Sequence, residues 1–267
     1  TLVLGSTGYL GAHLARRLPA GKLVMAARQP ATLAGLQVPC VAQDLTLGHA
    51  RLAPLAPATV WLCARPLADD LAEHTAFLQH TQVLLEGWAR AGTLRRLVVF
   101  STQLVARTPT HGERVQGQSP LAPEAAYDCA KAQLEVFAGY LARRFGLSVD
   151  VVRLPLLWGG QPTAADRSRQ FLHQWQSDLR AGHFWRFGPD DEAFGNSWVD
   201  VDDLVTALLP DPGPGLRVRC ASSGDFTYAQ LQQAWGAKPL PGGEMPLVRS
   251  RFLLQDELGL PPRGLPA

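Results

Sequence analysis

The chain begins with a short apolar run that leads into a glycine-rich turn and then into an amphipathic segment, TLVLGSTGYLGAHLARRL. Gly5, Gly8 and Gly11 follow one another at intervals of three residues. A buried strand joined by such a turn to a helix directs backbone N–H groups and the positive end of the helix dipole at an anion, typically a pyrophosphate. Because another apolar run begins at Leu23, the order strand, glycine-rich turn, helix, strand predicts a dinucleotide-binding βαβ unit. The spacing G-x-x-G-x-x-G nevertheless differs from the general G-x-G-x-x-G fingerprint.

Short apolar runs alternate with longer amphipathic segments through the first 160 residues. The runs that we expect to form buried strands are 2–4, 23–27, 38–42, 60–64, 97–101 and 148–159. The segments that we expect to form helices are 11–18, 74–92 and 127–145. Near-continuous apolar strands that alternate with helices are typical of a parallel sheet covered on both faces. The predicted fold class is therefore α/β, with a Rossmann-type doubly wound parallel sheet.

After residue 159 the sequence becomes rich in Gly, Trp, Phe and mixed charges. This change predicts a small C-terminal substrate-binding lobe formed by residues 159–195 and 223–267, with a surface helix and loops as the alternative for its first part. The dinucleotide-binding domain would then cover 1–158 and be completed by about 196–222. A late strand over 216–223 and short helices over 227–235 and 250–258 are expected in these regions.

Composition limits the classes of partner. The chain of 267 residues has a net charge of +2, which favours neither a nucleic-acid partner nor a membrane surface. Its four cysteines form no C-x-x-C pair, so the sequence predicts no metal site and no disulfide framework. No apolar run reaches transmembrane length and the sequence shows no charged leader before a signal-like core, so a cytoplasmic location is expected.

Two polar residues follow expected strands at positions where a dinucleotide would lie. The second strand ends in VMAARQP, which offers Arg28 where a cofactor with a free 2′-hydroxyl would favour an acidic residue. This favours NADP over NAD, with a solvated loop arginine as the alternative. Asp44 follows the third strand and is predicted to hydrogen-bond an adenine edge or, alternatively, to cap a turn.

A second set of polar residues suggests acid/base chemistry. Tyr127 and Lys131, in YDCAK, lie four residues apart and therefore on one face of the expected helix. A nearby cation favours a phenolate, which makes tyrosine a better base. Ser101 and Thr102 end an apolar strand at the edge where open α/β sheets bind their ligands.

Taken in order, these motifs resemble the extended branch of the short-chain dehydrogenase/reductase superfamily, the NAD-dependent epimerase/dehydratase family. The motifs that carry the resemblance span roughly residues 1–210 and are GSTGYLG, the DL at Asp44, VLLEGWARAG before RRLVVFST, YDCAK, RLPLLWGG and SWVDVDDLVTAL. G-x-x-G-x-x-G is this branch's own form of the phosphate-binding turn.

The resemblance implies a role for each matched residue. Tyr127 would be the catalytic acid/base, Lys131 would bind the nicotinamide ribose and lower the pKa of Tyr127, and Thr102 would hydrogen-bond the reacting oxygen. The implied cofactor-binding set is Gly5, Ser6, Thr7, Gly8, Tyr9, Leu10, Gly11, Arg28, Asp44, Leu45, Ala64, Lys131 and Pro155. The implied substrate-binding set is Thr102, Gln103, Tyr127, Trp158 and Trp198.

Departures from the family pattern leave the substrate open. Gln103 and Leu104 stand where related dehydratases carry an Asp-Glu pair, so 4,6-dehydration is not expected. The stretch TAADRSRQFLHQW is similar to a segment of deoxysugar 4-ketoreductases. The predicted function is hydride transfer with NADP, or with NAD, at a keto or hydroxyl carbon of a sugar nucleotide or similar metabolite, by reduction or epimerisation. The alternatives are a reductase or isomerase of a non-sugar ketone and a catalytically silent NADP-binding redox sensor. A homodimer is a further open expectation.

Overall fold

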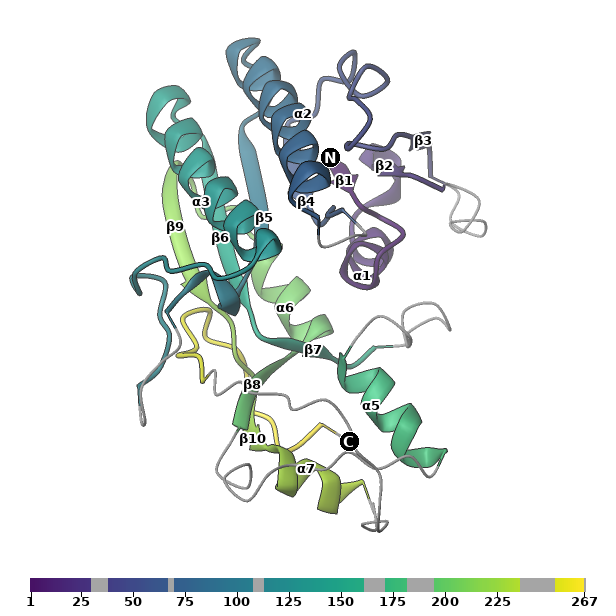
Figure 1. Ribbon diagram of the computed structural model, residues 1–267. Coiled ribbons are helices and arrows are strands. Elements are labelled where there is room, and N and C mark those ends of the chain that lie inside the picture. Colours follow the sequence, from purple (N-terminus) through teal and green to yellow (C-terminus); the bar gives the residue numbers. More distant parts are fainter. Residues whose placement is uncertain are drawn as a thin grey trace.

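The computed structural model describes residues 1–29, 38–66, 70–107, 113–160, 171–181, 195–235 and 253–266, and every structural statement below concerns these residues. A central sheet of seven parallel strands has the order β3-β2-β1-β4-β5-β6-β9 (Figure 1). Its strands are β1 (Leu2–Leu4), β2 (Val24–Ala27), β3 (Cys40–Ala42), β4 (Thr59–Leu62), β5 (Arg96–Thr102), β6 (Ser148–Leu154) and β9 (Gly215–Cys220). The predicted doubly wound parallel sheet is confirmed, and the strand order reverses between β1 and β4.

Helices cover both faces of this sheet. On one face lie α1 (Tyr9–Arg17) and α6 (Val201–Leu208), and on the other α2 (Leu71–Arg90) and α3 (Ala126–Phe145). Alternate residues of a strand point to opposite faces. Val3 accordingly packs in the core cluster with α1 and α6, whereas Leu2 and Leu4 pack in the cluster with α2 and α3. Both faces are buried, which explains why strands such as β1, β2 and β4 are largely apolar.

A smaller three-stranded sheet lies beyond the carboxyl ends of the main strands (Figure 1). It is formed by β7 (Leu156–Trp158), β8 (Gly195–Asp200) and β10 (Gly224–Thr227), next to helices α5 (Phe171–Arg180) and α7 (Tyr228–Ala234). Tryptophans dominate its core, which contains Trp158, Trp175 and Trp198. The division of the chain into two domains stays a prediction. By strand pairing, β7 belongs to the small sheet, while α6 packs on the main one.

Two predicted elements differ from the structure. The apolar run 148–159, predicted as one strand, is divided at Pro155 into β6 and β7, which belong to different sheets. Proline has no N–H to donate to a strand ladder, so it favours a break. The second difference concerns the predicted helix at 250–258, because its described part, 253–258, is not helical. Leu254 is instead fully buried and bridges to Val115, so tertiary contacts override the helical pattern there.

Candidate active site and cofactor cleft

The glycine-rich turn lies where β1 ends and α1 begins, and two of its glycines are required by the backbone. Gly5 has a φ of +81°, and a Cβ on it would lie 2.6 Å from the Cα of Ala64 at the end of β4. A Cβ on Gly11 would overlap the carbonyl oxygen of Gly5, so any side chain there would force α1 away from the turn. The turn is also held to β2, because the N–H groups of Gly5 and Ser6 both donate to the carbonyl oxygen of Ala26.

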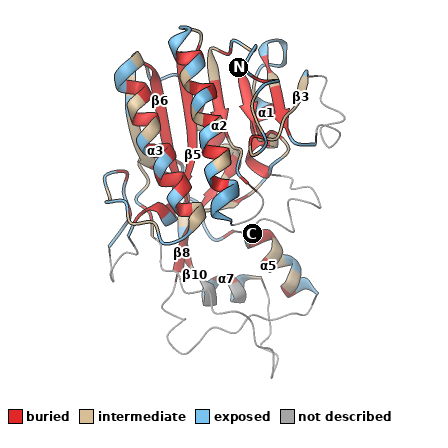
Figure 2. Cartoon of the chain, turned by 45° about the horizontal axis from the view of Figure 1, so that its top comes forward, coloured by how far each residue is buried: buried red, intermediate tan, exposed pale blue. Residues whose placement is uncertain are grey.

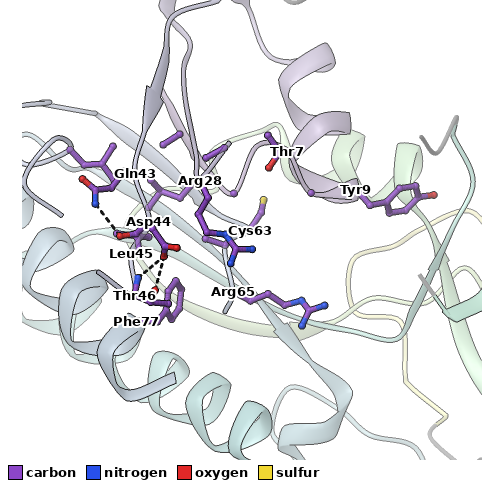
Figure 3. A pocket seen from close by; sticks show the side chains of 17 residues that line it. Thr7, Tyr9, Arg28, Gln43, Asp44, Leu45, Thr46, Cys63, Arg65 and Phe77 are labelled. Carbon is purple, nitrogen blue, oxygen red and sulfur yellow. Dashed lines mark hydrogen bonds between the residues drawn. The ribbon is translucent and has the colours of Figure 1, made fainter. Parts of the chain in front are cut away.

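A cavity opens directly against this turn, at the carboxyl edge of the sheet beside the ends of β1, β2 and β4 (Figure 3). Eight residues of the predicted cofactor-binding set line it: Gly5, Thr7, Gly8, Tyr9, Arg28, Asp44, Leu45 and Ala64. The other five do not line it: Ser6, Leu10, Gly11, Lys131 and Pro155. Ser6 is fully buried and donates its hydroxyl to the carbonyl oxygen of Ala26, so it braces the turn.

The two polar residues predicted to contact the cofactor differ in how they are held. Arg28 follows β2 and is exposed, with its side chain at the cavity (Figure 3). The Asp44 carboxylate accepts hydrogen bonds from the backbone N–H of Thr46 at 2.9 Å and from its hydroxyl at 2.8 Å. Asp44 therefore caps a turn, which is one of the two roles predicted for it, and it also lines the cavity.

Tyr127 and Lys131 lie in the first turns of α3, which packs against β5. The Lys131 ammonium donates to the carbonyl oxygen of Phe100 at 2.8 Å and lies 5.7 Å from the centre of the Tyr127 ring. Thr102 ends β5, two residues after Phe100, and its hydroxyl oxygen accepts from the backbone N–H of Leu104. One hydrogen bond thus ties the helix that carries the tyrosine to the strand that carries the threonine.

Burial sets the protonation of this pair. It lowers the pKa of Lys131 to about 8 and raises the pKa of Tyr127 above its usual value, because removal from water disfavours the charged form of each side chain. The positive charge of Arg65 opposes the increase at Tyr127. The lowering of the Tyr127 pKa that the resemblance assigns to Lys131 stays a prediction for the complex with cofactor.

A buried ion pair lies directly beneath this region. Arg153 on β6 and Glu135 on α3 are 3% and 5% exposed and meet at 2.9 Å. The Glu135 carboxylate also accepts the Ser101 hydroxyl at 2.6 Å. The Arg153 guanidinium donates further to the carbonyl oxygens of Gln116 and Ser119. This carboxylate–guanidinium pair therefore connects β5, β6, α3 and the loop that contains Gln116 and Ser119.

The predicted substrate-binding residues fall into two groups. Gln103 follows Thr102 and is only 5% exposed, and its side-chain carbonyl oxygen has no hydrogen-bond partner among the described residues. Such a buried acceptor is normally paired, which is consistent with a partner supplied by a ligand. Trp158 and Trp198 instead pack in the core of the small sheet, where Trp158 stacks on His173 with ring centres 4.4 Å apart. A substrate contact by either tryptophan stays a prediction.

The sequence analysis missed several residues of the cavity, including Gln43, Thr46, Cys63 and Arg65. Arg65 comes directly after an apolar strand, the same signal that identified Arg28 and Asp44, so it could have been found. Phe184, Trp185 and Phe187, in the Trp- and Phe-rich stretch predicted as part of the substrate-binding lobe, lie outside the described residues. Among the described residues, no three His, Cys, Asp or Glu side chains are grouped to hold a metal, and no helix is long and apolar enough to cross a membrane.

Known structures share this fold at low sequence identity. DesIV, a dTDP-glucose 4,6-dehydratase from Streptomyces venezuelae solved with NAD and TYD bound, aligns with a TM-score of 0.78 at 22% identity, over 98% of this chain and 92% of that chain. UDP-glucose 4-epimerase from Thermotoga maritima, solved with UDP-glucose, aligns with a TM-score of 0.77 at 19% identity, over 98% of this chain and 93% of that chain. No curated protein sequence matches significantly.

The sequence itself provides the family assignment. Residues 1–210 match the NAD dependent epimerase/dehydratase family. That range includes the glycine-rich turn, the cavity beside it and the Tyr127–Lys131 pair. The chain therefore belongs to the NAD dependent epimerase/dehydratase family, in the extended branch of the short-chain dehydrogenase/reductase superfamily.

Proposed function

We propose that this protein is an NADP-preferring oxidoreductase or epimerase that acts on a keto or hydroxyl carbon of a sugar nucleotide or similar metabolite. The observation that carries the proposal is the placement of Tyr127, Lys131 and Thr102 where β5 and α3 meet. A redox sensor that only binds NADP would have no need of this arrangement. The glycine turn supports the cofactor assignment, because Gly5 and Gly8 line the cavity at the N-terminus of α1.

Each residue of the group has a distinct role in this proposal. Tyr127 exchanges a proton with the substrate oxygen, and Thr102 donates a hydrogen bond to that oxygen. Lys131, held by the carbonyl oxygen of Phe100, keeps a positive charge near the phenol when it is protonated. The nicotinamide cofactor, when bound, supplies hydride transfer. Gln103 offers a substrate hydroxyl a buried carbonyl oxygen that has no partner among the described residues. Because an amide does not act as the acid of a dehydration, we propose reduction or epimerisation instead.

The substrate class is tested by direct assay. The purified protein would be incubated with NADPH and either nucleotide-linked 4-keto sugars or steroid-like and flavonoid-like ketones, and loss of absorbance at the NADPH band would be recorded. Conversion between nucleotide sugar epimers would be followed in parallel by chromatography. We expect turnover of a nucleotide-linked sugar. Turnover of the non-sugar ketones alone would refute the sugar-nucleotide assignment, and NADPH binding without any turnover would favour a sensor.

Arg28 is proposed to select NADP through the 2′-phosphate. A charge-assisted hydrogen bond contributes about 1.5–3 kcal/mol, so Arg28→Ala is expected to weaken NADPH binding by about tenfold or more and to leave NADH binding nearly unchanged. Calorimetric titration with each cofactor measures both affinities. Arg95→Ala is the matched control, since it removes an exposed arginine from the opposite end of the sheet. Equal losses for NADPH and NADH in Arg28→Ala would contradict the proposed selectivity.

We also propose that the protein dimerises through α2 and α3. Figure 2 shows these helices side by side, with exposed residues along their outer faces. Val83 and Val136 are 53% and 62% exposed there, next to a largely apolar groove that includes Leu121, Phe137 and Tyr140. Val136→Glu is expected to shift the protein toward monomer in sedimentation experiments, because the new charge would be desolvated in the interface. An unchanged sedimentation coefficient, or a monomeric wild type, would exclude dimerisation through this surface.

A further inference from the structure

Arg65 is an exposed arginine at the cofactor cleft to which neither the sequence motifs nor the family assignment gives a role. It follows β4 and Ala64, and its side chain lines the cavity. In Figure 3 this side chain extends away from Asp44 and Thr46. Among the described residues no carboxylate lies within ion-pair distance of Arg65, so its charge is not neutralised by a neighbouring acid there.

The contact that Arg65 does make is with the proposed acid/base. Its guanidinium carbon lies 5.9 Å from the centre of the Tyr127 ring, nearly the same distance as the Lys131 ammonium at 5.7 Å. A cation within about 6 Å of a ring centre is attracted to its π electrons. The attraction becomes stronger when the phenol loses its proton and carries a full negative charge.

Two further groups near Tyr127 come from α2 and α3. The His74 ring, from α2, lies 6.0 Å away between ring centres. Asp128, the next residue of α3, is negatively charged and raises the pKa of Tyr127. Cys63, just before Ala64, interacts with Lys131, and because burial raises its pKa it remains a neutral thiol. The positive charge of Arg65 acts in the opposite direction and lowers the pKa of Tyr127.

Arg65 and Lys131 differ in how their charge depends on pH. Burial lowers the pKa of Lys131 to about 8, so its ammonium loses its proton in the mildly alkaline range before cofactor binds. A guanidinium stays protonated throughout that range. Arg65 is therefore the permanent cation beside Tyr127, whereas the charge of Lys131 is conditional.

We propose that Arg65 is a positioning residue for the acid/base Tyr127: its guanidinium, held over the phenol ring at the edge of the cofactor cleft, stabilises the phenolate independently of Lys131. This inference rests on the proposed function for its relevance to turnover. The predicted effect is a property of Tyr127 itself, so it can be measured without substrate. A failure of this inference can therefore be distinguished from a failure of the proposed function.

The test is a residue-resolved titration of the phenol. The four tyrosines, Tyr9, Tyr127, Tyr140 and Tyr228, would be replaced biosynthetically by 3-fluorotyrosine, whose more acidic phenol titrates at a lower pH. The fluorine resonance missing in Tyr127→Phe assigns the signal of Tyr127. In Arg65→Gln we expect the midpoint of that signal to rise by about half to one pH unit, as expected for loss of a charge about 6 Å away in a partly solvated site.

Two further variants separate charge from structure. Arg65→Lys keeps a cation and is expected to titrate close to the wild type, whereas Arg95→Gln removes an exposed charge at the opposite end of the sheet and is expected to change nothing. A wild-type midpoint in Arg65→Gln would overturn the inference. An increase of the same size in Arg65→Lys would also overturn it, because the effect would then depend on packing and not on charge.

Discussion

Replacing Tyr127 with phenylalanine is expected to lower turnover by about 100- to 10,000-fold, the usual contribution of a positioned acid/base group. The substitution removes only the hydroxyl, so the ring can keep its packing beside Arg65, Lys131 and His74. Because the Tyr127 side chain does not line the cofactor cavity, NADPH affinity should remain within a few-fold of the wild type. Steady-state kinetics on the substrate identified by assay, together with calorimetric titration of NADPH, measure the two quantities separately.

The matched control for this variant lies on the same helix. Tyr140 is more than three helical turns away on α3, and its hydroxyl donates to the Glu86 carboxylate at 2.8 Å. Tyr140→Phe removes the same atom far from the proposed site and should leave kcat unchanged. If Tyr127→Phe retained wild-type turnover, Tyr127 would not be the acid/base. If it lost NADPH binding as well, the loss of activity would be a consequence of altered structure.

The second large effect concerns the buried pair beneath the site. Glu135→Ala is expected to lower the free energy of unfolding by about 3–5 kcal/mol, because it leaves the Arg153 guanidinium buried without its counter-charge. The melting temperature should fall by roughly 10 °C. Urea unfolding followed by circular dichroism measures the free energy. The Glu135 contacts with Ser101 and Arg153 link α3 to β5 and β6. Their loss should therefore also make the positions of Tyr127 and Lys131 on α3 less fixed.

A double variant distinguishes the cost of an unpaired charge from simple loss of packing. Glu135→Leu combined with Arg153→Met removes both charges and should recover much of the stability, since apolar replacement of a buried pair is often close to neutral. Arg90→Ala, which breaks the exposed pair with Glu86, should have a small effect by comparison. A double variant as unstable as Glu135→Ala would mean that packing around these side chains, and not the uncompensated charge, dominates.

Local pattern was sufficient to predict most of the main sheet. The strands of the first half and the helices α1, α2 and α3 lie close to their predicted positions, because apolar runs and helical periodicity are properties of neighbouring residues. The glycine spacing was equally informative, since Gly5 has a φ of +81° in the turn and Gly11 closely approaches the carbonyl oxygen of Gly5 within the same strand–turn–helix unit. Short-range signals of this kind need no knowledge of the rest of the chain.

Contacts between distant segments were not predictable from the sequence alone. The division of 148–159 into strands of two sheets depends on where β8 lies, and the extended conformation at Leu254 depends on its pairing with Val115. Likewise, no sequence pattern distinguished tryptophans that pack together, such as Trp158 and Trp198, from tryptophans that face a ligand. In each case the deciding partner is more than 35 residues away in the chain.

The sequence by itself determined the fold class, the dinucleotide-binding turn and the family, because each depends on residue types at fixed short spacings. Only the tertiary structure showed that Arg65 joins Lys131 beside Tyr127, and that Glu135 and Arg153 form a buried pair beneath them. These groups come from different strands and helices, and their charges interact through space. Electrostatic interactions depend on distance and burial, which are fixed only when the chain has folded.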